Sequence, residues 1–400
     1  KLHFKECDAI LIFLATCLIL PFAFQLYLCL QILVWDEKPA AVSIQRKTDI
    51  AHSQSIQNHK GPSSPYCITF LGDTMLANLG LDAASHLSHP RDSFKYIQPL
   101  LQQCQTVIAN LEGPITQLGL DSDPFHMGPT YSFNMDPDLL PQLLIEQGIT
   151  KVNRANNHLR DRGEAGVVDT TRHLDRAGIE FFGCGRTKQE AAKPLLLNLD
   201  TDPKTVIGIT GYSDYYRRGI LPNPERNQTG ILPVNKEHAL LGRQLLDQHN
   251  VALRIAFVHW GDNYKPISET MRQQAKVLVN QGGFDLILGS DGSHTVQEFD
   301  FVDNVPVLYN IGNFLFQTPG RFQKSDSMPY GVITHLHLDP SGQGFTSLEL
   351  HCTHVDNLEV HYQRRICSKS MAAHLFGGLG PHVHYEHGHS YARVMLNSQR

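Results

Sequence analysis

The feature that most constrains the fold of this chain is a repeated alternation between short apolar runs and helical segments. Seven runs rich in Ile, Val, Leu and Phe occupy residues 67–73, 106–113, 149–158, 205–212, 254–261, 284–291 and 305–314. Such runs are typical of strands that are buried on both faces of a sheet. Segments between them, such as 166–179 and 271–283, place apolar residues at helical spacing and end near glycine. The alternation predicts a layered α/β domain.

Two later segments have a different pattern. Residues 331–339 and 345–356 alternate with period two on either side of the turn sequence PSGQG, which predicts a β-hairpin. We expect the globular domain to span residues 66–358 and residues 359–400 to form a loose, histidine-rich tail. Its segment HVHYEHGH, residues 382–389, is interpreted as solvated chain that binds nickel or copper adventitiously.

The N-terminal part of the chain has a separate character. Residues 9–35 form an uncharged apolar run that is longer than the roughly 20 residues needed to cross a bilayer core. This run predicts one transmembrane anchor, preceded by a short flank of residues 1–8 and followed by a polar linker of residues 36–65. Basic residues precede the run and acidic residues follow it, so we expect the main domain to lie outside the cytoplasm. A cleaved signal peptide is the alternative.

Composition excludes one class of partner. The 400 residues carry a formal net charge of -5, and this gives no basic field of the kind that holds nucleic acid by its phosphates. The eight cysteines include no CxxC pair, and we interpret them as free thiols, buried where they lie in the domain. A disulfide between Cys352 and Cys367 is the alternative that an oxidising compartment would allow.

Polar side chains stand at the ends of five predicted strands. They are Asp73, Glu112, Asn157 with His158, His259, and Asp291 with His294. Because the carboxyl ends of strands in an α/β sheet face one crevice, we expect these groups to gather there. Carboxylate, amide oxygen and imidazole are ligands of divalent metals, and such a site would support hydrolysis by a metal-activated water. His158 would suit the role of proton donor.

Seven ordered motifs carry a family resemblance. They are ITFLGDTML, VIANLEGPIT, ANNHLRDRG, FFGCGRTKQEAAKP, FVHWGDNY, GSHTVQ and YNIGNFLF, over residues 66–318. Together they resemble the CapA family of bacterial capsule and poly-γ-glutamate biosynthesis proteins, a branch of the calcineurin-like metallophosphoesterases. The resemblance implies a four-layer α/β/β/α sandwich at the cell envelope. It also implies an anionic polymer, polyglutamate or polysaccharide, and other capsule-assembly proteins as partners.

The resemblance also implies roles for individual residues. The implied metal ligands are Asp73, Glu112, Asn157, His259, Asp291 and His294, and His158 is the implied catalytic residue. Asn156 and Asp161 would close and orient the loop around His158. The expected cofactor is one or two divalent ions, whether manganese, iron, zinc or magnesium.

Two residues depart from the family pattern. Asp291 stands where the family has a histidine, and Asn263 stands where it commonly has a glutamate. A carboxylate at position 291 shifts the preference towards harder ions such as manganese or magnesium. Taken singly, Asp73 also suits a strand-ending turn, and His259 also suits a buried core histidine.

The sequence alone therefore supports three hypotheses for the function. The first is an envelope protein of capsule or poly-γ-glutamate biosynthesis or export. The second is an active metal-dependent phosphoesterase that hydrolyses an envelope phosphoester. The third is a polymer-binding module whose catalytic site has decayed, because a fold does not determine a reaction.

Overall fold

The computed structural model describes residues 66–76, 89–124, 132–200, 204–214, 222–223, 228–290, 294–317 and 319–396. The predicted anchor of residues 9–35 and the linker of residues 36–65 lie outside these ranges. Within these ranges, none of the helices combines the length and the apolar composition that a bilayer crossing requires.

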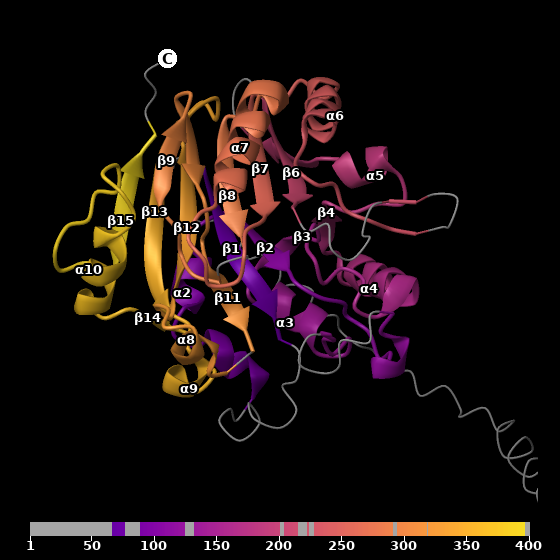
Figure 1. Ribbon diagram of the computed structural model, residues 1–400, viewed down its shortest axis with the longest axis horizontal. Helices are drawn as coiled ribbons and strands as arrows, with labels where there is room; N and C mark the ends of the chain where they lie inside the picture. The colour runs from indigo at the N-terminus through magenta and orange to yellow at the C-terminus, as the bar shows by residue number, and fades with distance from the viewer. Residues whose placement is uncertain are drawn as a thin grey trace, which may run out of the picture. The chain divides into compact units, whose positions relative to one another are not determined.

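The first of two β-sheets contains nine strands (Figure 1). Its main path runs β14 (Arg365–Ile366), β13 (Phe345–His354), β12 (Tyr330–Leu338), β1 (Cys67–Met75), β2 (Thr106–Leu111), β3 (Ile149–Asn153) and β4 (Glu180–Phe182). Strands β1 to β4 are parallel to one another, whereas β12 runs antiparallel to β1. Two strands lie off this path: β11 (Asn313–Phe316) pairs with β1, and β15 (Tyr391–Met395) pairs with β13.

The second sheet contains six strands, in the order β5 (Leu195–Leu199), β6 (Thr205–Ser213), β7 (Leu253–His259), β8 (Leu286–Ser290), β10 (Val305–Leu308) and β9 (Phe299–Val302). Strands β6, β7, β8 and β10 are parallel, and the two edge strands are antiparallel to their neighbours. The chain returns from this sheet to the first one between β10 and β11, through residues 309–312.

Helices cover the outer face of each sheet. On the first sheet lie α2 (Gln98–Leu101), α3 (Leu140–Glu146) and α4 (Gly163–Ala177), and on the second lie α5 (Lys188–Ala192), α6 (Lys236–Asp247) and α7 (Glu269–Val277) with its continuation Leu278–Gly282. The apolar core between the sheets includes Ile68 of β1, Leu348 of β13 and Phe257 of β7, all fully buried. This arrangement confirms the predicted α/β fold with two sheets, and all seven predicted strands and the predicted hairpin of β12 and β13 are present.

The expected loose tail is wrong for most of its length. After α8 (Arg321–Lys324) and α9 (Asn357–Val360), the chain forms β14, α10 (Lys369–Gly377) and β15. Strand β15 pairs with β13 over five residues, and Leu375 and Val394 are buried in the core between the sheets. The domain therefore continues to residue 396. The five-residue strand is too short to give a periodic signal beside so many histidines.

The interpretation of the cysteines as free thiols is also wrong for four of them. Disulfides join Cys67 to Cys104 and Cys352 to Cys367, and Cys184 is the free cysteine among the residues described, where it is buried. The partners meet through the fold: Cys104 follows α2 and lies beside the start of β1, and Cys367 follows β14, which pairs with β13. The structure thus confirms the alternative pairing of Cys352 with Cys367, whereas sequence spacing gives no sign of the pair Cys67–Cys104.

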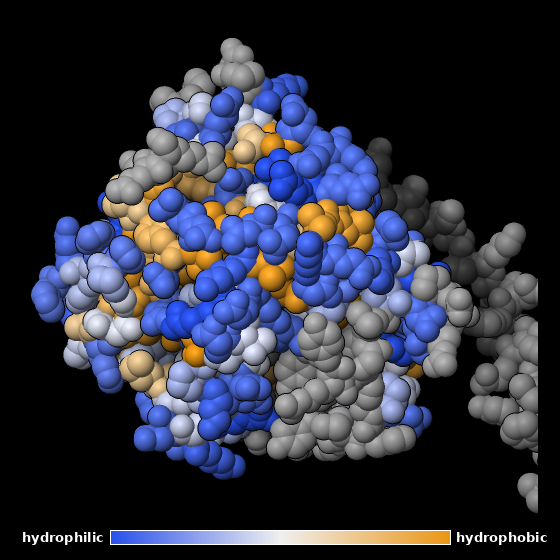
Figure 2. Space-filling model, turned by 45° about the horizontal axis from the view of Figure 1, so that its top comes forward, coloured by the Kyte–Doolittle hydropathy of each residue, from blue (hydrophilic) through white to orange (hydrophobic). Residues whose placement is uncertain are grey.

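On the face of the molecule shown in Figure 2, hydrophobic surface is divided by hydrophilic side chains. The exposed large apolar residues lie on separate elements, for example Val168 on α4, Leu240 on α6 and Met395 on β15. Apolar residues scattered in this way are normal on a protein surface.

Candidate active site

Strand topology brings the predicted residues of four strands to one place. Strands β1, β2 and β3 are parallel neighbours, so their carboxyl ends meet at one edge of the first sheet. Asp73 lies in β1, Glu112 directly follows β2, and the Asn157–His158 pair lies in the loop between β3 and α4. His259 is the last residue of β7 and reaches the same point from the second sheet.

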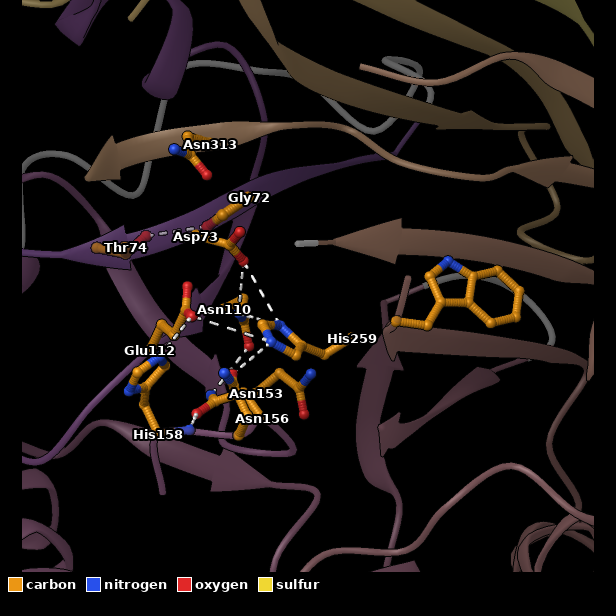
Figure 3. Close-up of polar contacts among 12 residues, drawn as sticks. Gly72, Asp73, Thr74, Asn110, Glu112, Asn153, Asn156, His158, His259 and Asn313 are labelled. Atoms are coloured by element: carbon orange, nitrogen blue, oxygen red, sulfur yellow. Dashed lines mark hydrogen bonds and ion pairs between the residues drawn. The ribbon is translucent and has the colours of Figure 1, made fainter. Parts of the chain in front are cut away.

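Asp73 and His259 meet through an asparagine (Figure 3). The Asn110 side-chain nitrogen donates to Asp73 Oδ1 at 2.7 Å and lies 3.1 Å from His259 Nδ1, and His259 Nδ1 is 3.7 Å from Asp73 Oδ1. All three side chains are fully buried. A buried carboxylate beside an imidazole is costly unless both are bonded, which favours a functional role for both residues.

Gly72 explains why the first motif reads Gly-Asp. A methyl group on Gly72 would lie 1.8 Å from the carbonyl oxygen of Gly312, the residue that leads into β11. Residue 72 must therefore lack a side chain so that β11 can pair beside Asp73. The glycine allows the backbone at residue 312 to lie close against β1. A turn at Asp73 is therefore not needed to explain the Gly-Asp sequence.

His158 is held on three sides. Its Nδ1 lies 2.6 Å from Asp161 Oδ2, its ring stacks on Phe133 with centroids 4.0 Å apart, and its Nε2 faces Glu112 Oε1 at 3.6 Å. Asp161 also accepts the backbone N–H of Phe133 at 2.7 Å. This arrangement directs Nε2 towards Glu112 and the crevice, as a proton-transferring group requires.

The two asparagines of the ANNH segment have different positions. Asn157 Oδ1 lies 2.8 Å from His259 Nε2, so its amide oxygen joins the group at the sheet ends. The Asn156 side chain donates to the Leu111 carbonyl at 2.8 Å and accepts the backbone N–H of His158 at 3.2 Å. Asn156 therefore closes the loop, as its sequence position predicts.

His294 reaches the site indirectly. Its Nδ1 lies 3.1 Å from the side-chain oxygen of Asn313, and Asn313 pairs with Asp73 in the register of β11 and β1. The backbone of His294 has a positive φ of 56°, which is uncommon for a residue with a side chain and typical of functional loops. The predicted ligand Asp291 lies outside the described residues.

Sequence reasoning missed Asn110 and the contact of the Asn313 side chain with His294. Asn110 precedes Glu112 by two residues, so strand alternation turns both side chains towards the same face. That alternation would have identified Asn110. Asn313 gave no comparable signal, because its partner Asp73 is 240 residues away in the chain.

The donor groups fit a divalent ion. Asp73 and Glu112 supply carboxylates, Asn157 an amide oxygen, and His259 an imidazole, and His259 Nε2 lies 4.0 Å from Glu112 Oε1. Oxygen and imidazole donors of this kind suit manganese, iron, zinc or magnesium. His259 turns Nδ1 towards Asp73 and Nε2 towards Glu112, so an ion in this arrangement would be bound by His259 together with one of the two carboxylates, while His158 stands beside Glu112.

Several known proteins are similar to this chain. The family model described as bacterial capsule synthesis protein PGA_cap matches residues 67–318. The capsule biosynthesis protein CapA of Bacillus anthracis is 25% identical over 310 residues, which are 76% of this chain and 70% of that protein. The PGA biosynthesis protein CapA of Bacillus subtilis is 22% identical over 286 residues, 71% of each chain.

Similarity to solved structures is more distant. The calcineurin-like phosphoesterase YfkN from Bacillus subtilis has a TM-score of 0.43 and 13% identity, covering 70% of this chain and 87% of that one. At this distance the likeness assigns no reaction. The family match covers more than half of the chain and all five motifs that carry the candidate site. The chain therefore belongs to the family of bacterial capsule synthesis proteins that includes CapA.

Proposed function

We propose that this chain is a membrane-anchored envelope protein of capsule or poly-γ-glutamate biosynthesis or export, with a metal site at the strand ends. The observation that carries the proposal is the meeting of Asp73, Glu112 and His259 from two sheets at one buried point. The names of the relatives supply the polymer class. An anionic polymer and other capsule-assembly proteins are the proposed partners.

The polymer assignment is tested in a bacterium that makes poly-γ-glutamate. In Bacillus subtilis that lacks its own PGA biosynthesis protein CapA, we expect this chain to restore poly-γ-glutamate to at least one tenth of the parental amount. Asp73→Asn should not restore it, because the ion would be lost. Equal polymer from both proteins would remove the site from the function. No polymer from either, at matched protein levels, would contradict the polymer assignment.

The anchor is proposed from residues 9–35, with the main domain outside the cytoplasm. Two disulfides support this placement, because disulfides persist in oxidising compartments. We expect the full chain to stay with membranes through washes with high salt and alkaline carbonate, since the uncharged run of residues 9–35 is longer than the roughly 20 residues that cross the bilayer core. Release of the protein by carbonate would contradict the anchor.

A second function, hydrolysis of an envelope phosphoester, is favoured by the setting of His158. The bound ion would supply an acidic water and a charge that stabilises the phosphoryl oxygens. His158 Nε2, directed by Asp161, would give its proton to the departing oxygen, and burial of the group would exclude bulk water.

The two functions differ in one measurement. His158→Ala is expected to lower phosphodiesterase turnover about a hundredfold or more, the usual contribution of a positioned acid, while metal content changes little. The assay uses a chromogenic phosphodiester with manganese, and metal is measured in the same samples. Equal losses of turnover and metal would reassign His158 as a ligand. A protein that binds ions but shows no turnover would leave capsule assembly or polymer binding as the role.

A further inference from the structure

A second cluster of metal-ligating side chains lies away from the strand ends. His335 and His337 belong to β12, and Glu349 and His351 belong to β13. His335 pairs directly with Glu349 in the register of the hairpin, and the other two histidines are two residues along each strand. Residues so placed project from one face of a sheet. Their neighbours Leu336, Leu348 and Leu350 face the core between the sheets, so the cluster lies on the outer face.

The distances are close to those of a coordination shell. One ligand atom from each of His335, Glu349 and His351 lies within 4.8 Å of the other two. Glu349 Oε2 is 3.6 Å from both His337 Nε2 and His351 Nε2, and the rings of His335 and His351 are 4.5 Å apart. Donors around a tetrahedral zinc ion are about 3.4 Å apart, so small side-chain rotations would close the set.

The imidazoles in this cluster have only weak partners in the described part of the protein: Glu349 Oε2 lies 3.6 Å from Nε2 of both His337 and His351, and the Leu100 carbonyl faces His335. His335 is fully buried, and neither of its ring nitrogens makes a hydrogen bond of ordinary geometry to a described residue; the same holds for Nε2 of His337 and His351. A buried polar atom without a partner costs on the order of 1–3 kcal/mol. A cation bound by these nitrogens would remove that cost.

The charges in the cluster suit a cation. Burial lowers the pKa of His335 to about 3, helped by His351 and His337, while Glu349 and the Leu100 carbonyl oppose the shift only in part. The pKa of Glu349 is lowered by His337, His351 and Arg393, against the effect of burial.

Glu349 is also oriented from the opposite side. Arg393 of β15 donates to Glu349 Oε1, which leaves Oε2 directed towards the histidines. An outer partner that orients a ligating carboxylate is a usual feature of metal sites. The Glu349 and His337 side chains keep 16% and 26% exposure, so an ion can enter from solvent.

We propose that His335, Glu349 and His351, with His337 as a fourth donor, form a zinc-type site that joins β12 to β13. Two imidazoles and a carboxylate are a common zinc set. The site is separate from the strand-end group, which is the set of Asp73, Glu112 and His259. His335 pairs with Thr69 of β1, and Thr69 lies four residues before Asp73, or about 13 Å along the strand. The proposal is independent of the proposed function.

The test compares the full chain with His335→Phe and with Glu349→Gln/His351→Gln, all purified without a metal-affinity step. Zinc chloride is titrated by calorimetry, and bound zinc is counted by elemental analysis. We expect each variant to lose one equivalent of zinc, or at least a hundredfold in affinity. His354→Gln is the matched control, since His354 also lies on β13 beside a glutamate, Glu359, and outside the cluster; it should keep the full zinc content.

Stability gives an independent readout. In EDTA, His335→Phe should melt at a higher temperature than the wild type, because a buried imidazole without a partner is replaced by an apolar ring of similar shape. With saturating zinc the order should reverse. A wild type that melts higher in both solutions, or zinc content unchanged in all variants, would overturn the proposal.

Zinc could also bind at the histidines of residues 382–389 or at the site of Asp73, and variants at each place distinguish these possibilities. Zinc lost only when the histidines of residues 382–389 are replaced would assign binding to that exposed segment and overturn the proposal. Zinc lost only in Asp73→Asn would assign it to the strand ends, also against the proposal. Loss in the cluster variants with the Asp73-dependent equivalent retained would support it, whatever the outcome for the capsule function.

Discussion

Asp73→Asn is expected to empty the strand-end metal site while the domain stays folded. The asparagine keeps the volume of the aspartate, and its side-chain oxygen can still accept the hydrogen bond from Asn110. Only the anionic charge is lost. Because removal of an outer partner alone weakens metal binding by about 10–100-fold, loss of a direct ligand should exceed a hundredfold. Elemental analysis of the full chain, purified without a metal-affinity step, measures the change.

The matched control for this variant is Asp161→Asn. Asp161 is also a buried carboxylate in the site, but it contacts His158 and Phe133 and is not predicted to be a ligand. Its replacement should weaken metal binding by about tenfold to a hundredfold at most. Circular dichroism melting of both proteins verifies that they fold. An Asp73→Asn protein with the metal content of the wild type would refute the assignment of Asp73.

The second large effect is expected from Cys67→Ala/Cys104→Ala. The disulfide closes a loop with a sequence separation of 37 residues, and its loss frees the unfolded chain. In the chain-entropy description such a loop is worth about 4 kcal/mol of the free energy of unfolding. The bond also attaches the segment after α2 to the first residue of β1, the strand that carries Asp73. Urea unfolding measures the difference.

Cys184→Ala is the control for the loss of a buried sulfur. Cys184 is buried and free, and burial raises the pKa of its thiol, so it acts as a small apolar side chain. Its replacement should cost about 1 kcal/mol. Dithiothreitol should destabilise the wild type by more than the double variant shows, because it also opens Cys352–Cys367. Equal losses in the Cys184 and Cys67/Cys104 proteins would mean that the disulfide adds nothing.

The core of the fold could be predicted because its strands are apolar on both faces. The run from Cys67 to Asp73 and the run that ends at His259 can each be recognised as a strand from their own apolar sequence, without knowledge of the neighbouring strands. Parallel topology then places their ends together, which is why Asp73, Glu112 and His259 could be grouped from sequence. The grouping of these three side chains follows from strand order.

The remaining features depend on contacts that sequence spacing does not encode. The pairing of β15 with β13, the Cys67–Cys104 disulfide, and the link from His294 to Asn313 each join segments whose separation in the chain carries no period. The histidine cluster on β12 and β13 was visible only as alternation in a hairpin. It is recognised as a possible metal site only when the strand register places His335 opposite Glu349.

The division of the strand-end group between two sheets has a consequence for the lifetime of the protein. Asp73 and Glu112 come from the first sheet and His259 from the second, so an ion bound by His259 and either carboxylate, as proposed above, would resist separation of the two sheets. Ligands that bind only the native state slow its unfolding and its proteolysis. Under the proposed function, a shortage of that ion in the surrounding compartment would therefore shorten the lifetime of the protein before any change in its expression.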